Sequence, residues 1–130
     1  MNADLGAFLR ALAATEFAWG TKDCALVIAD WWEANHGSDP AFYLRETYSS
    51  QAECHAVLER EGGLGRLVSR LARSVGAIRS SGDKAGDFGI IRHGGRHLAA
   101  IRTQSGRWAV KGEKCVTALK NPKVVAAWHV

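Results

Sequence analysis

Cys24 is the residue in this 130-residue sequence whose setting most clearly indicates reactive chemistry. It follows the aromatic-glycine segment Phe17-Ala18-Trp19-Gly20 and Asp23, and the apolar spacing after it predicts that it lies in the first turn of a helix. Free N–H groups and the positive end of a helix dipole stabilise a thiolate, so we expect a lowered thiol pKa and a nucleophilic role. A purely structural cysteine is the alternative. Cys54, inside a predicted helix, and Cys115, in a loop or short strand, are interpreted as packing residues.

A cysteine nucleophile needs a base within hydrogen-bond reach, and histidine suits this task because its pKa lies near neutrality. His97 begins a predicted strand in which His97, Ala99 and Ile101 share one face, so we expect its ring to project toward a helix packed on that face. His93 lies on the other side of the Gly94-Gly95 turn, and an exposed hairpin histidine is the alternative for both. The remaining histidines, which have simple structural explanations, are His36, His55 and His129.

These candidates must be positioned by helices in the first two thirds of the chain and strands in the last third. Apolar residues recur at helical spacing before Gly76, and short β-like runs separated by turn residues follow Gly86. Ser50-Gln51-Ala52-Glu53 is a capping box that opens one of the helices. The predicted helices are 4–14, 23–36, 51–61 and 64–75, and the predicted strands are 88–92, 98–103, 108–110 and 124–130.

Helices followed by strands predict an α+β domain, with the N-terminal helices packed on a C-terminal antiparallel sheet. The length and the 47% hydrophobic content fit one domain over residues 1–130. No apolar run is long enough to span a membrane, and the N-terminus lacks the pattern of a signal peptide, so we expect synthesis in the bacterial cytoplasm without a signal peptide. Three cysteines at unrelated spacings indicate neither a disulfide framework nor a zinc site, and we expect no metal and no cofactor.

Charge is distributed unevenly between the two halves of the chain. Residues 1–65 carry four Lys/Arg and ten Asp/Glu, a net −6, whereas residues 66–130 carry thirteen and three, a net +10. Such asymmetry indicates an anionic partner or two complementary halves that fold against each other. An anionic partner requires that the arginines of the predicted strands line an open face, whereas complementary halves require that they pair with acids of the first half. These arginines are Arg92, Arg96, Arg102 and Arg107.

Several short motifs recur along the chain in an order typical of one family. They are Trp19-Gly20, Asp23-Cys24, Ala29-Asp30, Gly37-Ser38-Asp39-Pro40-Ala41, Arg45-Glu46-Thr47-Tyr48, Gly86-Asp87, His97-Leu98-Ala99-Ala100-Ile101 and Ala127-Trp128-His129-Val130. The chain thereby resembles the NlpC-type papain-like cell-wall cysteine peptidases and, more closely, a compact phage and prophage tail-associated family related to them.

The resemblance implies a papain-like fold in which Cys24 attacks a peptide or amide carbonyl and His97 takes and returns the proton. The implied protein is a phage-tail or prophage-encoded hydrolase of peptidoglycan stem peptides, located in the virion tail. Its implied partners are peptidoglycan or another anionic wall polymer and other phage tail proteins, whereas nucleic acid is not expected.

Two departures from the family pattern favour an alternative function. First, Ala25-Leu26 follows the cysteine where the family usually has Ser-Gly. Second, the family places a third polar residue on the strand after the histidine strand, and the nearest positions in this chain are Ala109, Val110 and Lys111. None of these side chains can orient a protonated imidazole. The alternative is a non-catalytic structural or assembly protein of a phage tail that keeps a degenerate papain-like fold.

Overall fold

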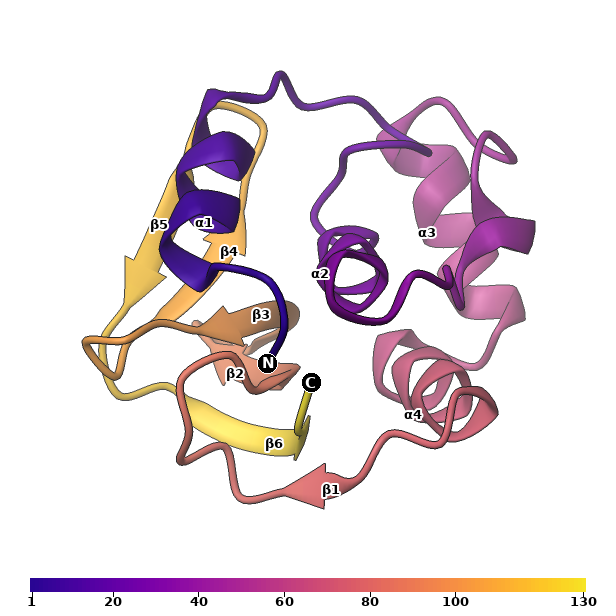
Figure 1. Cartoon of the computed structure of the whole chain (residues 1–130). Helices are drawn as coiled ribbons and strands as arrows, with labels where there is room; N and C mark the ends of the chain where they lie inside the picture. Colours follow the sequence, from indigo (N-terminus) through magenta and orange to yellow (C-terminus); the bar gives the residue numbers. More distant parts are fainter.

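A six-stranded antiparallel sheet forms one side of the computed structural model, which describes residues 1–130 (Figure 1). Its strands lie in the order β1-β6-β2-β3-β4-β5, and every neighbouring pair is antiparallel. The predicted α+β class and the predicted antiparallel sheet are therefore confirmed. The strands are β1 (Arg79–Ser80), β2 (Phe88–His93), β3 (Arg96–Arg102), β4 (Trp108–Lys111), β5 (Val116–Leu119) and β6 (Lys123–Trp128).

Two of the helices begin where a side chain satisfies one of their free N–H groups. The Asp4 carboxylate accepts a hydrogen bond from the Ala7 N–H at 2.9 Å, and the Ser50 hydroxyl accepts one from the Glu53 N–H at 3.1 Å. No helix is long and apolar enough to cross a membrane. The helices are α1 (Leu5–Ala14), α2 (Val27–His36), α3 (Gln51–Arg60) and α4 (Leu64–Ser74), with a short 3₁₀ helix η1 (Phe42–Leu44).

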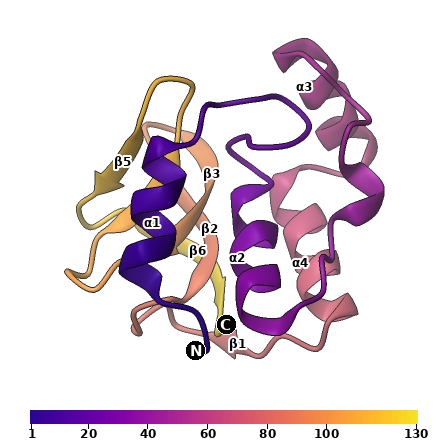
Figure 2. The same cartoon turned by 45° about the horizontal axis from the view of Figure 1, so that its top comes forward.

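Helix α2 lies in the middle of the molecule, between the sheet on one side and α3 and α4 on the other (Figure 1). Figure 2 shows the same arrangement, with α1 beside the sheet. Trp31 of α2 is fully buried in a cluster with Ile90 and Ile101 of the sheet, and its indole N–H donates to the Gly86 carbonyl at 2.8 Å. Burying side chains of this size stabilises a fold by about 1.5–3 kcal/mol each, so α2 is held firmly against β2 and β3.

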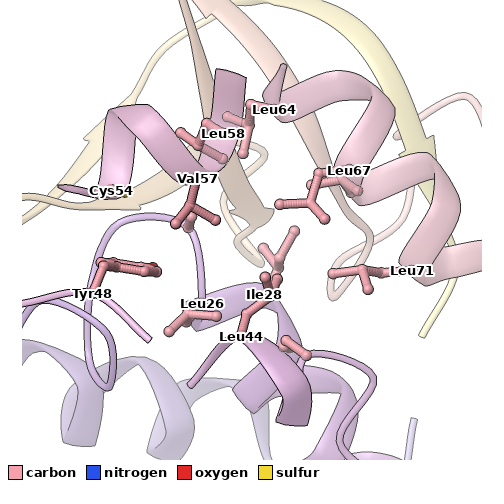
Figure 3. Close-up of a pocket in the computed structure, with 14 residues that line it drawn as sticks. Leu26, Ile28, Leu44, Tyr48, Cys54, Val57, Leu58, Leu64, Leu67 and Leu71 are labelled. Atoms are coloured by element: carbon pink, nitrogen blue, oxygen red, sulfur yellow. The ribbon is translucent and has the colours of Figure 1, made fainter. Parts of the chain in front are cut away.

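A second apolar cluster joins α2 to α3 and α4. Figure 3 shows its side chains pointing toward one another around a cavity, with Leu26 and Ile28 on one side and Val57, Leu67 and Leu71 on the other. The cavity holds only about 20 Å³, room for about one water molecule, and every residue that lines it is apolar. This region is therefore part of the core.

Both ends of the chain lie close together beside the inner strands β2 and β6 (Figure 1). The side chains of Met1 and Val130 both reach the neighbourhood of Gly86, at 2.5 and 3.5 Å from where a Cβ would be on that glycine. The first residues are tied down, because the Asn35 amide oxygen accepts hydrogen bonds from the Asn2 and Ala3 N–H groups. The N-terminus is thus fixed to the end of α2.

The acidic and basic halves do not neutralise each other by pairing. Only one ion pair, Glu61 with Arg70, joins an acid of the first half to a base of the second. The Arg102 guanidinium donates to the Gly82 carbonyl at 2.8 Å and is partly buried, so it belongs to no open face. Close ion pairs between the two halves are therefore nearly absent, and most of the basic side chains form no ion pair.

Candidate active site

A cleft of about 420 Å³ lies between the loop before α2, helix α3 and strand β3. This volume is typical of small-molecule and peptide sites. The structure places the predicted nucleophile Cys24 and the predicted base His97 in its lining. The other lining residues are Phe17, Trp19, Ala25, Gln51, Cys54, His55, Leu58, Leu64, Arg96, Leu98, Ala99, Val110, Lys111, Gly112, Glu113 and Thr117.

Asp23 determines the position of Cys24. Its carboxylate is fully buried, and one oxygen accepts hydrogen bonds from the Ala25 N–H at 3.0 Å and the Leu26 N–H at 2.9 Å. Asp23 therefore caps a turn over residues 24–26, and α2 begins at Val27 instead of at the predicted Asp23. The N–H groups expected to stabilise a thiolate at Cys24 are bound to this carboxylate.

The other oxygen of Asp23 fixes two segments to the same point. It accepts hydrogen bonds from the Gly20 N–H at 2.9 Å and the Tyr48 hydroxyl at 2.5 Å. In return, the Gly20 carbonyl accepts from the Glu46 N–H at 2.8 Å. The Trp19-Gly20 turn and the segment 46–48 are thereby locked together beneath the cysteine.

Arg45 holds the same loop from the outside. Its guanidinium pairs with Asp30 at 2.7 Å and Asp39 at 2.5 Å and also donates to the Thr21 carbonyl at 3.1 Å. Lys22 adds a second cation to Asp30 at 3.2 Å. Three of the short motifs found in the sequence thus meet in one charged network, whose effect is to position the segment that carries Cys24.

The thiol of Cys24 is not activated in the way that the sequence predicts. Burial, followed by the negative charge of Asp23, raises its pKa to about 11, and the nearby Arg96 lowers it only in part. The prediction of a lowered pKa is therefore wrong, because burial of the thiol and the adjacent Asp23 carboxylate both disfavour the thiolate. Cys24 is a neutral thiol at physiological pH.

The rate of alkylation at different pH values should report the raised pKa of Cys24 directly. A pKa of about 11 leaves about one thiol in 10,000 ionised at pH 7, so iodoacetamide should modify Cys24 slowly there and faster up to about pH 11. We expect the exposed Cys115 to react first. Mass mapping across a pH series measures both rates, and Cys115→Ser isolates that of Cys24. Half-maximal reactivity of Cys24 below pH 9 would contradict the capping argument.

His97 lies where the strand alternation predicts. Ala99 and Ile101 of β3 are buried in the cluster that packs against α2, whereas Leu98 and Ala100 face the opposite side of the sheet. His97 shares the face of the first two and is exposed within the cleft. No hydrogen bond joins its ring to another side chain.

The position of a third catalytic residue holds no side chain that could orient His97, as the sequence predicts. Ala109 is buried opposite Ile101, and Val110, which also borders the cleft, packs on the cluster of the far face of the sheet. The buried ammonium of Lys111 donates to the carbonyls of Leu12 and Thr15 at 2.9 and 2.8 Å. Lys111 therefore ties the C-terminal end of α1 to β4, a favourable place for a cation, and is not free to orient His97.

The other histidines fall into two groups. His36 stacks on Trp32 with ring centroids 3.9 Å apart, and the His129 ring lies 2.8 Å from the buried Asp87 carboxylate. His93 is exposed and does not line the cleft. These three have the structural explanations expected of them, whereas His55 lines the cleft and was missed.

Helix α3 contributes a wall that sequence reasoning did not find. Gln51, His55 and Leu58 line the cleft, and their i, i+4, i+7 spacing places them on one face of the helix. That spacing is the signal that could have found them. Glu113, in the turn after β4, is the one carboxylate that lines the cleft and was also missed.

Comparison with known proteins assigns the chain to a family. Residues 1–130 match the family described as "Domain of unknown function (DUF6950)", and the protein belongs to it. No curated protein and no solved structure matches the chain.

Proposed function

We propose that the protein is a cysteine hydrolase of papain-like, NlpC-type architecture that cleaves peptide or amide bonds. The observation that carries this proposal is that Cys24 and His97, from distant parts of the chain, line the same cleft. A turn that carries the nucleophile just before α2 and a strand that carries the base, both lining one cleft, form an arrangement that suits such chemistry.

Because Cys24 is protonated at neutral pH, its proton must leave as the bond to the substrate forms. The His97 ring takes the Sγ proton while Sγ bonds to the carbonyl carbon, and the same proton then passes to the amine as the C–N bond breaks. The resulting thioester is attacked by water, whose proton goes to His97. The C–S bond breaks, the acid is released and the thiol regains its proton.

The lining of the cleft fits an anionic peptide. Arg96 lies close enough to lower the pKa of Cys24 and has no acidic partner, so it is available for a substrate carboxylate. Phe17 and Trp19, packed edge to face with centroids 4.7 Å apart, supply an apolar wall. Peptidoglycan stem peptides, which carry free carboxylates, are the proposed substrates, and a phage or prophage tail is the proposed location.

Substitution of the two hairpin histidines tests the proposal. We expect His97→Ala to lower the hydrolysis rate of stem peptides about 100- to 10,000-fold, because general-base assistance is lost. His93→Ala is the matched control and should stay within about twofold of the parent rate, since His93 lies outside the cleft. New amine groups released from purified muropeptides are the readout. Equal rates for both variants would remove His97 from the reaction.

Two observations favour a second function. The raised pKa of Cys24 and the absence of a group that orients His97 both suit a non-catalytic protein of a phage tail that binds wall peptides without cleaving them. Muropeptide binding without release of amines, in the parent chain and in His97→Ala alike, would favour this candidate over the hydrolase.

A further inference from the structure

A row of arginines covers the exposed face of α4, on the side of the molecule away from β4 and β5 (Figure 1). Arg66, Arg70 and Arg73 recur at i, i+4 and i+7, so they lie on one helix face, about 6 and 4.5 Å apart along the axis. Together with Gly65 and Ser69 they line a shallow depression of about 320 Å³. We call these five residues the α4 arginine surface.

The positive charge of this surface is largely uncompensated. Residues 62–82 contain four arginines and no Asp or Glu. Glu61 alone approaches the surface, and its carboxylate and carbonyl accept from Arg70 at 2.5 and 3.0 Å. Arg66 and Arg73 have no acidic partner, and Arg66 is packed against Gly62, where a Cβ would lie 3.0 Å from its side chain.

The lining of the depression restricts the chemistry of a partner. It contains no apolar or aromatic residue, so neither an amphipathic helix nor a stacked nucleobase finds a contact there. Guanidinium groups form paired hydrogen bonds with oxyanions, and Ser69 adds a hydroxyl. Three cations within two helical turns suit a polymer that carries one anion at each short repeat.

We propose that the α4 arginine surface binds a linear phosphodiester chain through its phosphates. Successive phosphates pair with Arg66, Arg70 and Arg73, and the rest of each repeat stays in solvent. Arg70 exchanges its exposed ion pair with Glu61 for the phosphate. This site is separate from the cleft, since the two share no lining residue, and it does not depend on hydrolase activity.

Binding of a fluorescent glycerol-phosphate 12-mer by the full chain tests the proposal. Three phosphate contacts on a flexible chain predict that log K falls with log salt with a slope of about −2, and the double variant Arg66→Ala/Arg73→Ala should reduce the slope to about −0.7. We expect this variant to lose at least tenfold in affinity at low salt. Alanine favours helix, so the fold should persist, and circular dichroism checks it.

The matched control is Arg107→Ala/Lys120→Ala, which removes the same charge from exposed positions outside α4 and should retain affinity within about twofold. Equal losses in the two double variants, or no measurable binding, would overturn the proposal. Two further probes test whether the surface recognises phosphate groups or any polymer of the same negative charge. Oligo(dT)12 should lose affinity in Arg66→Ala/Arg73→Ala as the glycerol-phosphate 12-mer does, because the surface recognises phosphates. Equal affinity for poly-L-glutamate of matched charge would overturn recognition of phosphate.

Discussion

Cys24→Ala is expected to abolish amide hydrolysis, with a loss of at least about 1000-fold, because no thioester can form without the sulfur. Water would then have to attack the substrate directly, with only the cleft to orient it. Since Cys24 is half-buried and forms no disulfide, the fold should change little. Amine release from muropeptides measures the loss, and intact mass should detect an acyl adduct on the parent chain that is missing from the variant.

The other two cysteines provide the controls for this experiment. Cys115→Ser changes an exposed thiol outside the cleft and should leave the rate unchanged. Cys54→Ala changes a buried residue that also borders the cleft, so its unfolding must be measured alongside. Turnover that survives in Cys24→Ala would exclude the cysteine mechanism, whatever the cleft binds.

Gly20→Ala should destabilise the protein by about 3 kcal/mol or more, which is large against the total stability of a domain. Gly20 has a φ of +84°, and a Cβ there would lie 2.2 Å from the Tyr48 carbonyl oxygen. Neither backbone can yield easily, because the Gly20 N–H and the Tyr48 hydroxyl are both bound to Asp23. Urea unfolding measures the loss.

Gly37→Ala separates the cost of a positive φ from the cost of the contact with the Tyr48 carbonyl. Gly37 has a similar φ of +78° at the end of α2, but a Cβ there would meet nothing within 4 Å. This variant should therefore lose only about 1 kcal/mol, the cost of a left-handed alanine. Equal losses at the two glycines would show that the contact with Tyr48 does not constrain the loop.

Much of the secondary structure could be predicted because it is encoded locally. Asp4 and Ser50 cap their helices as their side-chain chemistry predicts, and the Gly94-Gly95 turn joins β2 to β3. The start of α2 was misplaced because a capping aspartate can precede a turn as well as a helix. The short edge strand β1 carries only two residues, too few for any alternation to be recognised.

The candidate site was predictable in its positions but not in its electrostatics. The alternation of side chains along β3 places His97 on the face that packs against α2. This prediction needs only the residues of β3 itself. The pKa of Cys24 is raised first by the burial of its thiol and then by the charge of Asp23, a carboxylate that the fold brings into contact with Tyr48, far along the chain. A local pattern cannot report such a contact, and the same is true of the wall formed by α3.

Both chain ends lie beside Gly86, so the path of the chain begins and ends at nearly the same point of the fold. A domain of this kind can be placed within a loop of a larger protein, because both connections leave from one point and the host chain is barely displaced. For the same reason, a short linker could join residues 130 and 1, and new ends could be opened at an exposed turn such as Gly94-Gly95. The order of elements along the chain is thus less constrained than their arrangement in space.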